Sequence, residues 1–357
     1  MINTSYYKDL TKMNTFGMKV KARCFIEYDS VADLVDIEFG ELARPVLHIG
    51  GGSNLLFTDD FKGTVLHSRI DFIEILDEGQ NNHEGQVLVS VGAGVVFDDF
   101  CAWAAKEGLW GVENLSHIPG EVGASAVQNI GAYGVEVKDV IRKVYCYDTV
   151  EEEFVHFEVS ECGYAYRDSI FKNPEIKGRF VVTHVLFALS KQPRPRLDYG
   201  HLKEAVTEAA APSCGSDNQS LTPALIRKTI IRIRKEKLPE PSVMGSAGSF
   251  FKNPVVPMEQ FVRIESAAKA EHGADYKVPH YLLPDDMVKI PAAWMIEQCG
   301  WKGRRSGGTA VYEKQPLVIV NYTGEAYPEE IVGLERRIMT SVRDRFGVEL
   351  CPEVEHI

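Results

Sequence analysis

The feature that most constrains this chain is a long stretch at residues 111–134, which is dense in glycine, alanine and side-chain amides. Small residues allow the backbone to approach a flat ligand closely. Gln128 and Asn129 place two amides together, and amides offer donors and acceptors to the edge of a heteroaromatic ring. A tightly packed Gly/Ala-rich helix and turn would explain the glycines but not the amide pair. The stretch therefore predicts a site for a flat heterocyclic ligand.

A second glycine-rich loop, Gly50-Gly51-Gly52-Ser53-Asn54, lies between two strand-like apolar segments at residues 46–49 and 55–57. Consecutive glycines let neighbouring backbone N–H groups converge into a nest that binds phosphate, and the serine and asparagine add neutral donors. A tight turn between strands explains the loop alone equally well. The loop is a poor dinucleotide fingerprint because no helix follows it, and no Gly-Lys-Ser/Thr of a Walker A motif occurs in the chain.

Composition limits the classes of partner. The chain has 39 Lys and Arg residues against 51 Asp and Glu residues, a formal charge of −12. This charge argues against a nucleic-acid partner, which requires cations to neutralise phosphates. No apolar run approaches the roughly 20 residues of a membrane helix, and the first residues lack the features of a signal peptide. Seven cysteines without a C-x-x-C motif predict reduced thiols in a cytoplasmic protein, with neither a disulfide framework nor a metal site.

The order of elements predicts an α+β fold, because strands and helices do not alternate regularly. Apolar periodicity predicts strands at residues 46–49, 87–91, 141–147, 154–159, 180–189 and 317–321. It predicts helices at residues 30–39, 97–107, 223–237, 257–272, 291–299 and 329–346. The third of these helices is basic, and such charges ordinarily form a solvated face. Residues 209–220 are interpreted as a loop, and Pro239 and Pro241 mark a domain boundary.

Five motifs in order carry a family resemblance. They are Gly-Gly-Gly-Ser-Asn-Leu-Leu at 50–56, the stretch at 111–134, Tyr-Arg-Asp-Ser-Ile-Phe at 166–171, Gly-Ser-Phe-Phe-Lys-Asn-Pro at 248–254 and Pro-Glu-Val at 352–354. Over essentially its full length, the chain resembles the UDP-N-acetylenolpyruvoylglucosamine reductases, FAD-dependent enzymes of peptidoglycan precursor synthesis. Tyr199-Gly200 resembles the subclass with an extra tyrosine-bearing loop.

The resemblance implies an FAD-binding fold of the vanillyl-alcohol-oxidase (PCMH) type plus a C-terminal α/β substrate-binding domain. It divides the chain into FAD-binding subdomains at residues 1–75 and 76–238 and a substrate-binding domain at 239–357. It implies non-covalent FAD, NADPH as co-substrate and UDP-N-acetylglucosamine enolpyruvate as substrate, and we expect a monomer. The implied FAD contacts are Gly50, Gly51, Gly52, Ser53, Asn54, Gly120, Val122, Gly123, Gln128, Asn129, Gly131, Ala132 and Tyr133.

The implied reaction reduces an enolpyruvyl ether to a lactyl ether, and the carbon beside the carboxylate must then receive a proton. The resemblance assigns the carboxylate and the developing enolate charge to Arg167, proton donation to Ser249, and polarisation of the enol to Glu353. Without the motifs, these residues would be interpreted as a structural ion-pair partner, a turn residue and part of a flexible tail.

The resemblance also implies substrate contacts. Tyr199 is expected to close over the diphosphate, Lys237 to lie near the substrate or nicotinamide phosphates, and Asn253 to contact the UDP-sugar. Each of these residues could instead be an ordinary surface or cap residue. The chain departs from the family at Glu355, where many members carry arginine, and His117 is interpreted as a tolerated variant rather than a covalent flavin anchor.

Two other functions are weighed against this one. A flavin carbohydrate or alcohol oxidase of the same superfamily often attaches FAD through a histidine in the glycine-rich loop, and residues 50–54 contain none. A catalytically inactive flavin- or nucleotide-sugar-binding regulator would not need Arg167, Ser249 and Glu353 together.

Overall fold

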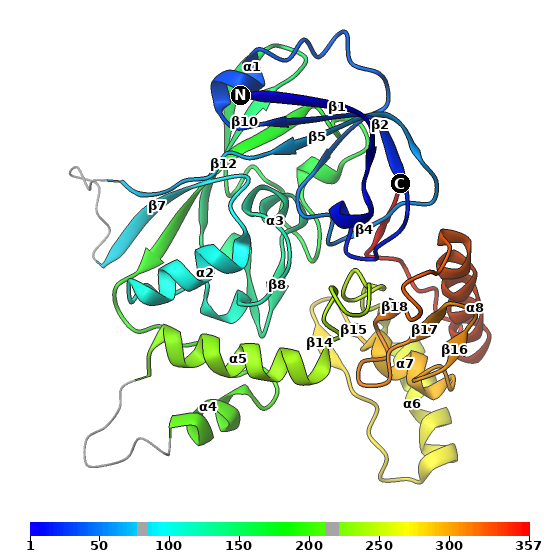
Figure 1. The fold of residues 1–357 in the computed structure, drawn as a ribbon. Helices are drawn as coiled ribbons and strands as arrows, with labels where there is room; N and C mark the ends of the chain where they lie inside the picture. Colours follow the sequence, from blue (N-terminus) through cyan, green and yellow to red (C-terminus); the bar gives the residue numbers. More distant parts are fainter. Residues whose placement is uncertain (77–84, 211–220) are drawn as a thin grey trace. The chain divides into compact units, whose positions relative to one another are not determined.

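The computed structural model describes residues 1–76, 85–210 and 221–357. They form two compact units, and Figure 1 labels many of their helices and strands. Unit 1 comprises Met1–Asp9, Lys21–Gly52 and Asp60–Glu236. Unit 2 comprises Leu10–Val20, Ser53–Asp59 and Lys237–Ile357. Neither unit is a continuous stretch of chain, although the last division falls close to the predicted boundary at residue 239.

The first sheet of unit 1 has the strand order β1-β2-β5-β3. Its strands are β1 (Ile2–Asp9), β2 (Lys21–Tyr28), β5 (Phe61–Ser68) and β3 (Val46–Ile49). β1 runs antiparallel to β2, whereas β2 and β3 both run parallel to β5. Between β2 and β3, α1 (Val31–Val35) begins at Ser30, which accepts a hydrogen bond from the Asp33 N–H as an N-cap. The helix is shorter than predicted because Ile37 and Phe39 leave it to pack in the core.

The second sheet of unit 1 is antiparallel, with the order β11-β10-β12-β7-β6. Its strands are β11 (Glu153–Glu158), β10 (Ile141–Asp148), β12 (Phe180–Ser190), β7 (Gln86–Gly92) and β6 (Ile73–Ile75). Four of the five were predicted within two residues, and the short β6 was not. β6 precedes residue 76, so the second sheet begins slightly before the predicted boundary between the FAD-binding subdomains. That boundary stays a prediction.

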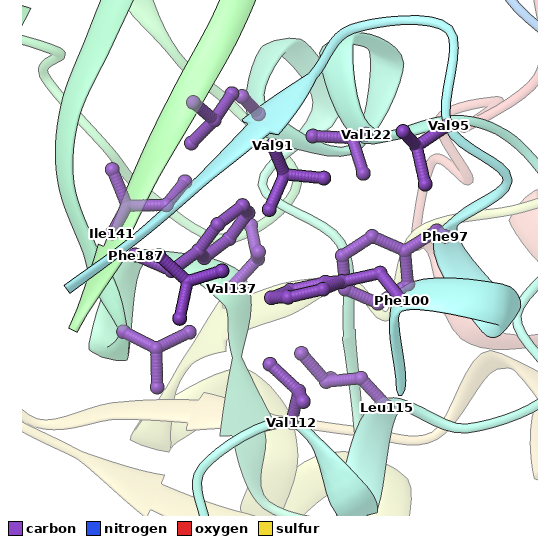
Figure 2. Close-up of a cluster of buried hydrophobic side chains, with 14 of the residues drawn as sticks. Val91, Val95, Phe97, Phe100, Val112, Leu115, Val122, Val137, Ile141 and Phe187 are labelled. Carbon is purple, nitrogen blue, oxygen red and sulfur yellow. The ribbon is translucent and has the colours of Figure 1, made fainter. Parts of the chain in front are cut away.

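A large apolar core joins this sheet to the glycine-rich stretch, as Figure 2 shows. Phe100 of α2 (Phe97–Lys106) packs on Phe187 of β12, with the ring centroids 4.7 Å apart. Val112, Leu115 and Val122 come from the stretch at 111–134 and are almost fully buried in the same cluster. The predicted ligand-binding stretch is therefore anchored on a rigid hydrophobic base, which includes the start of α3 (Val122–Gln128).

Two further helices complete unit 1. They are α4 (Leu202–Ala210) and α5 (Pro223–Lys237), whose apolar sides share a small cluster that contains Trp110. The basic face of α5 is only partly solvated, contrary to expectation. Arg227 binds both carboxylate oxygens of Asp98 on α2, the Nη2–Oδ2 distance being 3.0 Å. Part of the predicted loop, residues 211–220, lies outside the described residues, while Ala209 and Ala210 belong to α4.

Unit 2 contains two small three-stranded sheets and three helices. The strands are β13 (Val255–Pro257), β14 (Tyr281–Leu283), β15 (Met287–Lys289), β16 (Arg305–Ser306), β17 (Thr309–Val311) and β18 (Ile319–Asn321). The helices are α6 (Met258–His272), α7 (Ala292–Gln298) and α8 (Pro328–Phe346). Near the C-terminus, β19 (Glu355–His356) pairs in parallel with β4 (Leu55–Leu56). The predicted helices are present, but most of the short strands were not foreseen.

Two global predictions can be compared with the described residues. None of the helices there combines the length and the apolarity that a bilayer crossing demands. The cysteines described are free thiols, namely Cys24, Cys101, Cys146, Cys162, Cys299 and Cys351. Cys214 lies outside the described residues.

Candidate functional site

The two glycine-rich stretches of the sequence lie against each other in unit 1. A Cβ atom added at Gly50 would lie 3.1 Å from the Cβ of Ala124, and one at Gly51 would lie 3.4 Å from the Cα of Gly120. Gly52 has a φ of +61°, a conformation that favours glycine. Residues 50–52 and the start of α3 therefore form one close-packed glycine cradle. The loop divides at this point, because Ser53 and Asn54 belong to unit 2.

Val122 and Gly123 fix the position of α3. Their N–H groups donate to Val95 O at 2.9 Å and to Ala93 O at 3.0 Å. A Cβ at Gly123 would lie only 2.9 Å from the Cβ of Ala93, so glycine allows the close approach. These two N–H groups are used inside the protein. A direct contact of either residue with FAD stays a prediction.

The amide of Asn129 stabilises the turn that ends α3. Asn129 is fully buried and has a φ of +46°. Its Nδ2 donates to Ala165 O at 2.8 Å and to Glu136 Oε2 at 3.1 Å, and its Oδ1 accepts from the Lys138 N–H at 3.3 Å. The side chain is thus engaged by the protein itself, and its predicted contact with the cofactor stays untested.

Gln128 behaves differently from its neighbour. Its Oε1 accepts a hydrogen bond from Lys172 Nζ at 2.7 Å. Its Nε2 is buried and has no hydrogen-bond partner among the described residues. A buried donor without an acceptor is costly, so such a group fits a ligand that supplies one. The orphaned amide is consistent with a polar heterocycle such as the flavin of FAD, which carries several acceptors.

Arg167 lies against the same turn. It has a φ of +55°, and its Nη2 donates to Gly131 O at 2.6 Å while Nη1 lies 3.5 Å from Asn129 O. Ser169, two residues later, donates to Val127 O at 2.6 Å. The third motif of the sequence therefore packs directly on the second, and the predicted catalytic arginine lies beside predicted flavin contacts.

Tyr133 and Tyr199 meet edge to face, with their ring centroids 6.1 Å apart. Burial raises the pKa of Tyr133, although a hydrogen bond from Arg234 opposes the shift. Arg234 also donates through Nε to His117 O at 3.2 Å, and burial lowers the pKa of its guanidinium. The sequence offered no sign of this arginine beyond its membership of a basic helix. The predicted loop tyrosine thus contacts the glycine-rich stretch.

A buried histidine lies between two carboxylates next to the glycine cradle. His67 Nε2 is 2.9 Å from Glu121 Oε1, and His67 Nδ1 is 3.2 Å from Glu27 Oε1. Burial opposes protonation, but the hydrogen bonds and charges of the two glutamates raise the pKa of His67 overall. Glu121 Oε2 lies 3.2 Å from the Cβ position of Gly50. The raised pKa favours an imidazolium that offsets carboxylate charge beside a loop predicted to bind phosphate.

Unit 2 brings three other predicted segments together. Phe251 pairs with Pro352 as an antiparallel bridge, and the Glu353 N–H donates to Phe250 O at 2.8 Å. Asn54 Nδ2 donates to Glu353 O at 3.0 Å. Glu353 is therefore half-buried on a fixed segment, which removes the interpretation of a flexible tail. Ser249 precedes Phe250 and is also half-buried.

The remaining predicted substrate contacts are less enclosed. Asn253 Oδ1 accepts from the Ala292 N–H at 2.9 Å and so stabilises the start of α7. Lys237 is exposed at the end of α5. No group of three or more His, Cys, Asp or Glu side chains that could hold a metal ion occurs in residues 1–76, 85–210 and 221–357.

Comparison with known proteins decides the family. Residues 240–357 match the model of the UDP-N-acetylenolpyruvoylglucosamine reductase C-terminal domain, and residues 22–156 match an FAD binding domain. A UDP-N-acetylenolpyruvoylglucosamine reductase of Bacteroides fragilis is 50% identical over 349 residues, covering 98% of both chains. The chain belongs to the UDP-N-acetylenolpyruvoylglucosamine reductase family.

Other reductases of the family agree with this assignment. The enzyme of Porphyromonas gingivalis is 44% identical over 353 residues, covering 98% of this chain and 97% of its own. A crystal structure of the reductase from Thermus caldophilus shares the fold, with 22% identity, a TM-score of 0.63 and coverage of 100% and 98% of the two chains. The predicted fold class, an FAD-binding fold of the vanillyl-alcohol-oxidase type with a C-terminal substrate-binding domain, is confirmed.

Proposed function

We propose that Arg167, Ser249 and Glu353 carry out the family's reaction in this chain. The chain is an FAD-dependent oxidoreductase that uses NADPH to reduce UDP-N-acetylglucosamine enolpyruvate to UDP-N-acetylmuramate in peptidoglycan precursor synthesis. The observation that best supports the residue roles is the seat of Arg167. Its guanidinium donates to Gly131 O at 2.6 Å in the turn after α3, and Gln128, the last residue of that helix, has a buried amide nitrogen without a partner among the described residues.

FAD would be held by residues of both glycine-rich stretches. The close-packed glycines at 50–52 suit the diphosphate, and the Gln128 amide suits the polar edge of the ring. When bound, FAD would supply the hydride-transfer chemistry that links NADPH to the vinyl CH2 of the substrate. The protein supplies binding, orientation and the proton.

Hydride addition leaves carbanion or enol character on the carbon beside the substrate carboxylate. The planar guanidinium of Arg167 binds that carboxylate in a bidentate manner and stabilises the developing charge. The hydroxyl of Ser249 gives its proton to the carbon. A serine is a weak acid, so this step depends on a strongly basic enolate. Glu353 holds and polarises the enol.

The UDP-sugar would be bound by Tyr199, Lys237 and Asn253. Tyr199 is half-exposed next to Tyr133, as expected of a loop tyrosine that can reach a diphosphate. The exposed ammonium of Lys237 suits a phosphate. We also propose that the chain acts as a cytoplasmic monomer without nucleic-acid or membrane partners, which sedimentation equilibrium of the holoenzyme would check for the oligomeric state.

The Ser249→Ala variant tests the proton donor. We expect reduction of the flavin by NADPH to be nearly unchanged and reoxidation by substrate to slow by about 10²–10⁴-fold. Stopped-flow absorbance measures the two half-reactions separately, and solvent deuterium at the lactyl methine should fall with the same variant. Ser242→Ala, at an exposed position, is the control. Equal losses in both half-reactions would instead give Ser249 a packing role.

The reaction itself has a simpler test. The purified chain should be yellow, and it should oxidise NADPH only when an enolpyruvyl UDP-sugar is present. A colourless protein that does not bind FAD would contradict the assignment.

A further inference from the structure

One lysine of unit 1 contacts both the glycine-rich stretch at residues 111–134 and the proposed catalytic arginine. Lys172 is the last residue of a short 3-10 helix, Ile170–Lys172, and is half-buried. Its Nζ donates to Gln128 Oε1 at 2.7 Å and to the backbone oxygen of Arg167 at 3.1 Å. One ammonium group therefore fixes two residues that lie 39 positions apart in the chain.

The lysine also decides which way the Gln128 amide faces. An ammonium group has three donors and no acceptor, so only the amide oxygen can turn toward it. The NH2 group must then face away from Lys172. That nitrogen, Nε2, is buried and finds no acceptor in the described part of the chain. Lys172 thus orients the two N–H groups of Gln128 Nε2 so that they can donate to the acceptors of a ligand.

The second contact of Lys172 acts on the backbone of Arg167. This residue has a φ of +55°, which is unfavourable for a side chain with a Cβ and persists only where the surroundings support it. The charge-assisted hydrogen bond from Lys172 to Arg167 O supplies such support. In this conformation the guanidinium donates to Gly131 O at 2.6 Å.

We propose that Lys172 is a positioning residue for the reductase reaction. It orients the Gln128 amide so that its NH2 group donates to an acceptor of bound FAD, and it holds Arg167 in the conformation that receives the substrate carboxylate. Lys172 itself contacts neither ligand. The proposal rests on the residue roles given above for Gln128 and Arg167.

A simpler role for Lys172 is to stabilise the C-terminal end of α3 with positive charge. That role would lower the stability of the protein without changing how FAD binds. The two roles therefore differ in the dissociation constant of FAD and in the visible spectrum of the bound flavin, both of which can be measured without turnover.

The experiment compares Lys172→Met, Lys172→Arg and the control Lys106→Met, which removes an exposed lysine of α2. FAD affinity is measured by fluorescence titration of the apoprotein, the flavin spectrum by absorbance, and kcat and KM with the enolpyruvyl UDP-sugar. We expect Lys172→Met to weaken FAD binding by about tenfold, to shift the spectrum and to lower kcat by at least tenfold. Lys172→Arg, which keeps charge and donors, should recover most of each loss, and Lys106→Met should match the wild type.

A double-mutant cycle with Gln128→Leu tests whether Lys172 acts on FAD binding through Gln128. If Lys172 acts on FAD through Gln128, adding Lys172→Met to Gln128→Leu should cost little further affinity. Additive losses, or an unchanged affinity and spectrum in Lys172→Met, would overturn the proposal. Gln128→Leu alone keeps the test decisive if Lys172→Met does not fold, because unchanged FAD binding there overturns it too. A wild-type chain that binds FAD but does not reduce the substrate would count against the proposed function instead.

Discussion

Among single residues, His48 combines buried ring nitrogens with a strongly lowered pKa. Its two ring nitrogens are buried and have no hydrogen-bond partner among the described residues, and burial lowers its pKa to about 4. The unfolded chain takes up this proton near pH 6.5, whereas the folded chain resists it until about pH 4. Acidification therefore favours the unfolded state across this window. His48 is consequently expected to stabilise the fold only at neutral or higher pH.

Replacement of His48 tests this dependence on pH. We expect His48→Leu to reduce the loss of unfolding free energy between pH 6.5 and pH 4, by at most about 3 kcal/mol at the acidic end. Urea unfolding at several pH values measures the effect as a difference from wild type, which cancels the contribution of other groups. His201→Leu, at an exposed position, should leave the profile unchanged. A parallel profile for His48→Leu would mean that this imidazole does not stay neutral in the folded state.

Two neighbouring residues, Gln128 and Asn129, show how far the sequence alone could predict the site. Residue type and motif predicted that Gln128 and Asn129 would both face a ligand. Asn129 is engaged by three groups of the protein, whereas the amide nitrogen of Gln128 has no partner among the described residues. Their order in the sequence carries no information about this division. It depends on Lys172 and on Ala165, which reach the turn through tertiary packing.

Among helices and strands, those with a clear apolar period were predictable, whereas very short or exposed ones were not. α2 and α8 follow the 3.6-residue period, and their observed ends lie within one residue of the predicted ones. β1 escaped prediction because nearly all of its side chains are exposed, so no alternation marks it. β16 and β17 have two and three residues, too few to show a period. Their pairing depends on neighbours that only the fold supplies.

Two glycines of unit 2 give a matched test of how elements pack. A Cβ at Gly245 would lie 2.2 Å from Phe16 O, a backbone atom that also accepts from Asn321 Nδ2 at 3.0 Å. Apart from its chain neighbours and the backbone of its own helix, Gly333 in α8 has no atom within 4 Å of its Cβ position. We expect Gly245→Ala to lower the free energy of unfolding by about 3 kcal/mol and Gly333→Ala to raise it by about 0.5–1 kcal/mol.

Denaturant unfolding with near-UV circular dichroism measures both variants. The pair adds the same methyl group at both positions, one in a helix with open space and one against a backbone oxygen. Similar changes in the unfolding free energy for the two substitutions would show that residues 10–20 do not pack tightly against Gly245.

For the whole molecule, the fragments that can fold alone depend on which segments of the chain build each unit. Unit 2 is built from three separate segments. The C-terminal family model begins at residue 240, but unit 2 also includes Leu10–Val20 and Ser53–Asp59. Phe16 lies edge-on to Phe250 with the ring centroids 6.2 Å apart, and Thr58 donates through its hydroxyl to Ile357 O at 2.7 Å. No local sequence pattern indicates these long-range contacts, and the predicted domain boundary at residue 239 takes no account of them.

Because unit 2 also needs two N-terminal segments, we expect a fragment of residues 237–357 to fold poorly by itself. It would lack the buried side chains of Phe16, Met18, Leu56 and Phe57. Each such side chain contributes about 1.5–3 kcal/mol when buried, so together they approach the 5–15 kcal/mol that stabilises a typical domain. We expect the fragment to show no cooperative thermal transition, whereas the full chain does. Differential scanning calorimetry compares the two, and a sharp transition of the fragment at the temperature of the full chain would refute the prediction. Because the missing segments include Asn54, which donates to Glu353 O at 3.0 Å, the same loss should also release the segment that carries the proposed enol-binding glutamate.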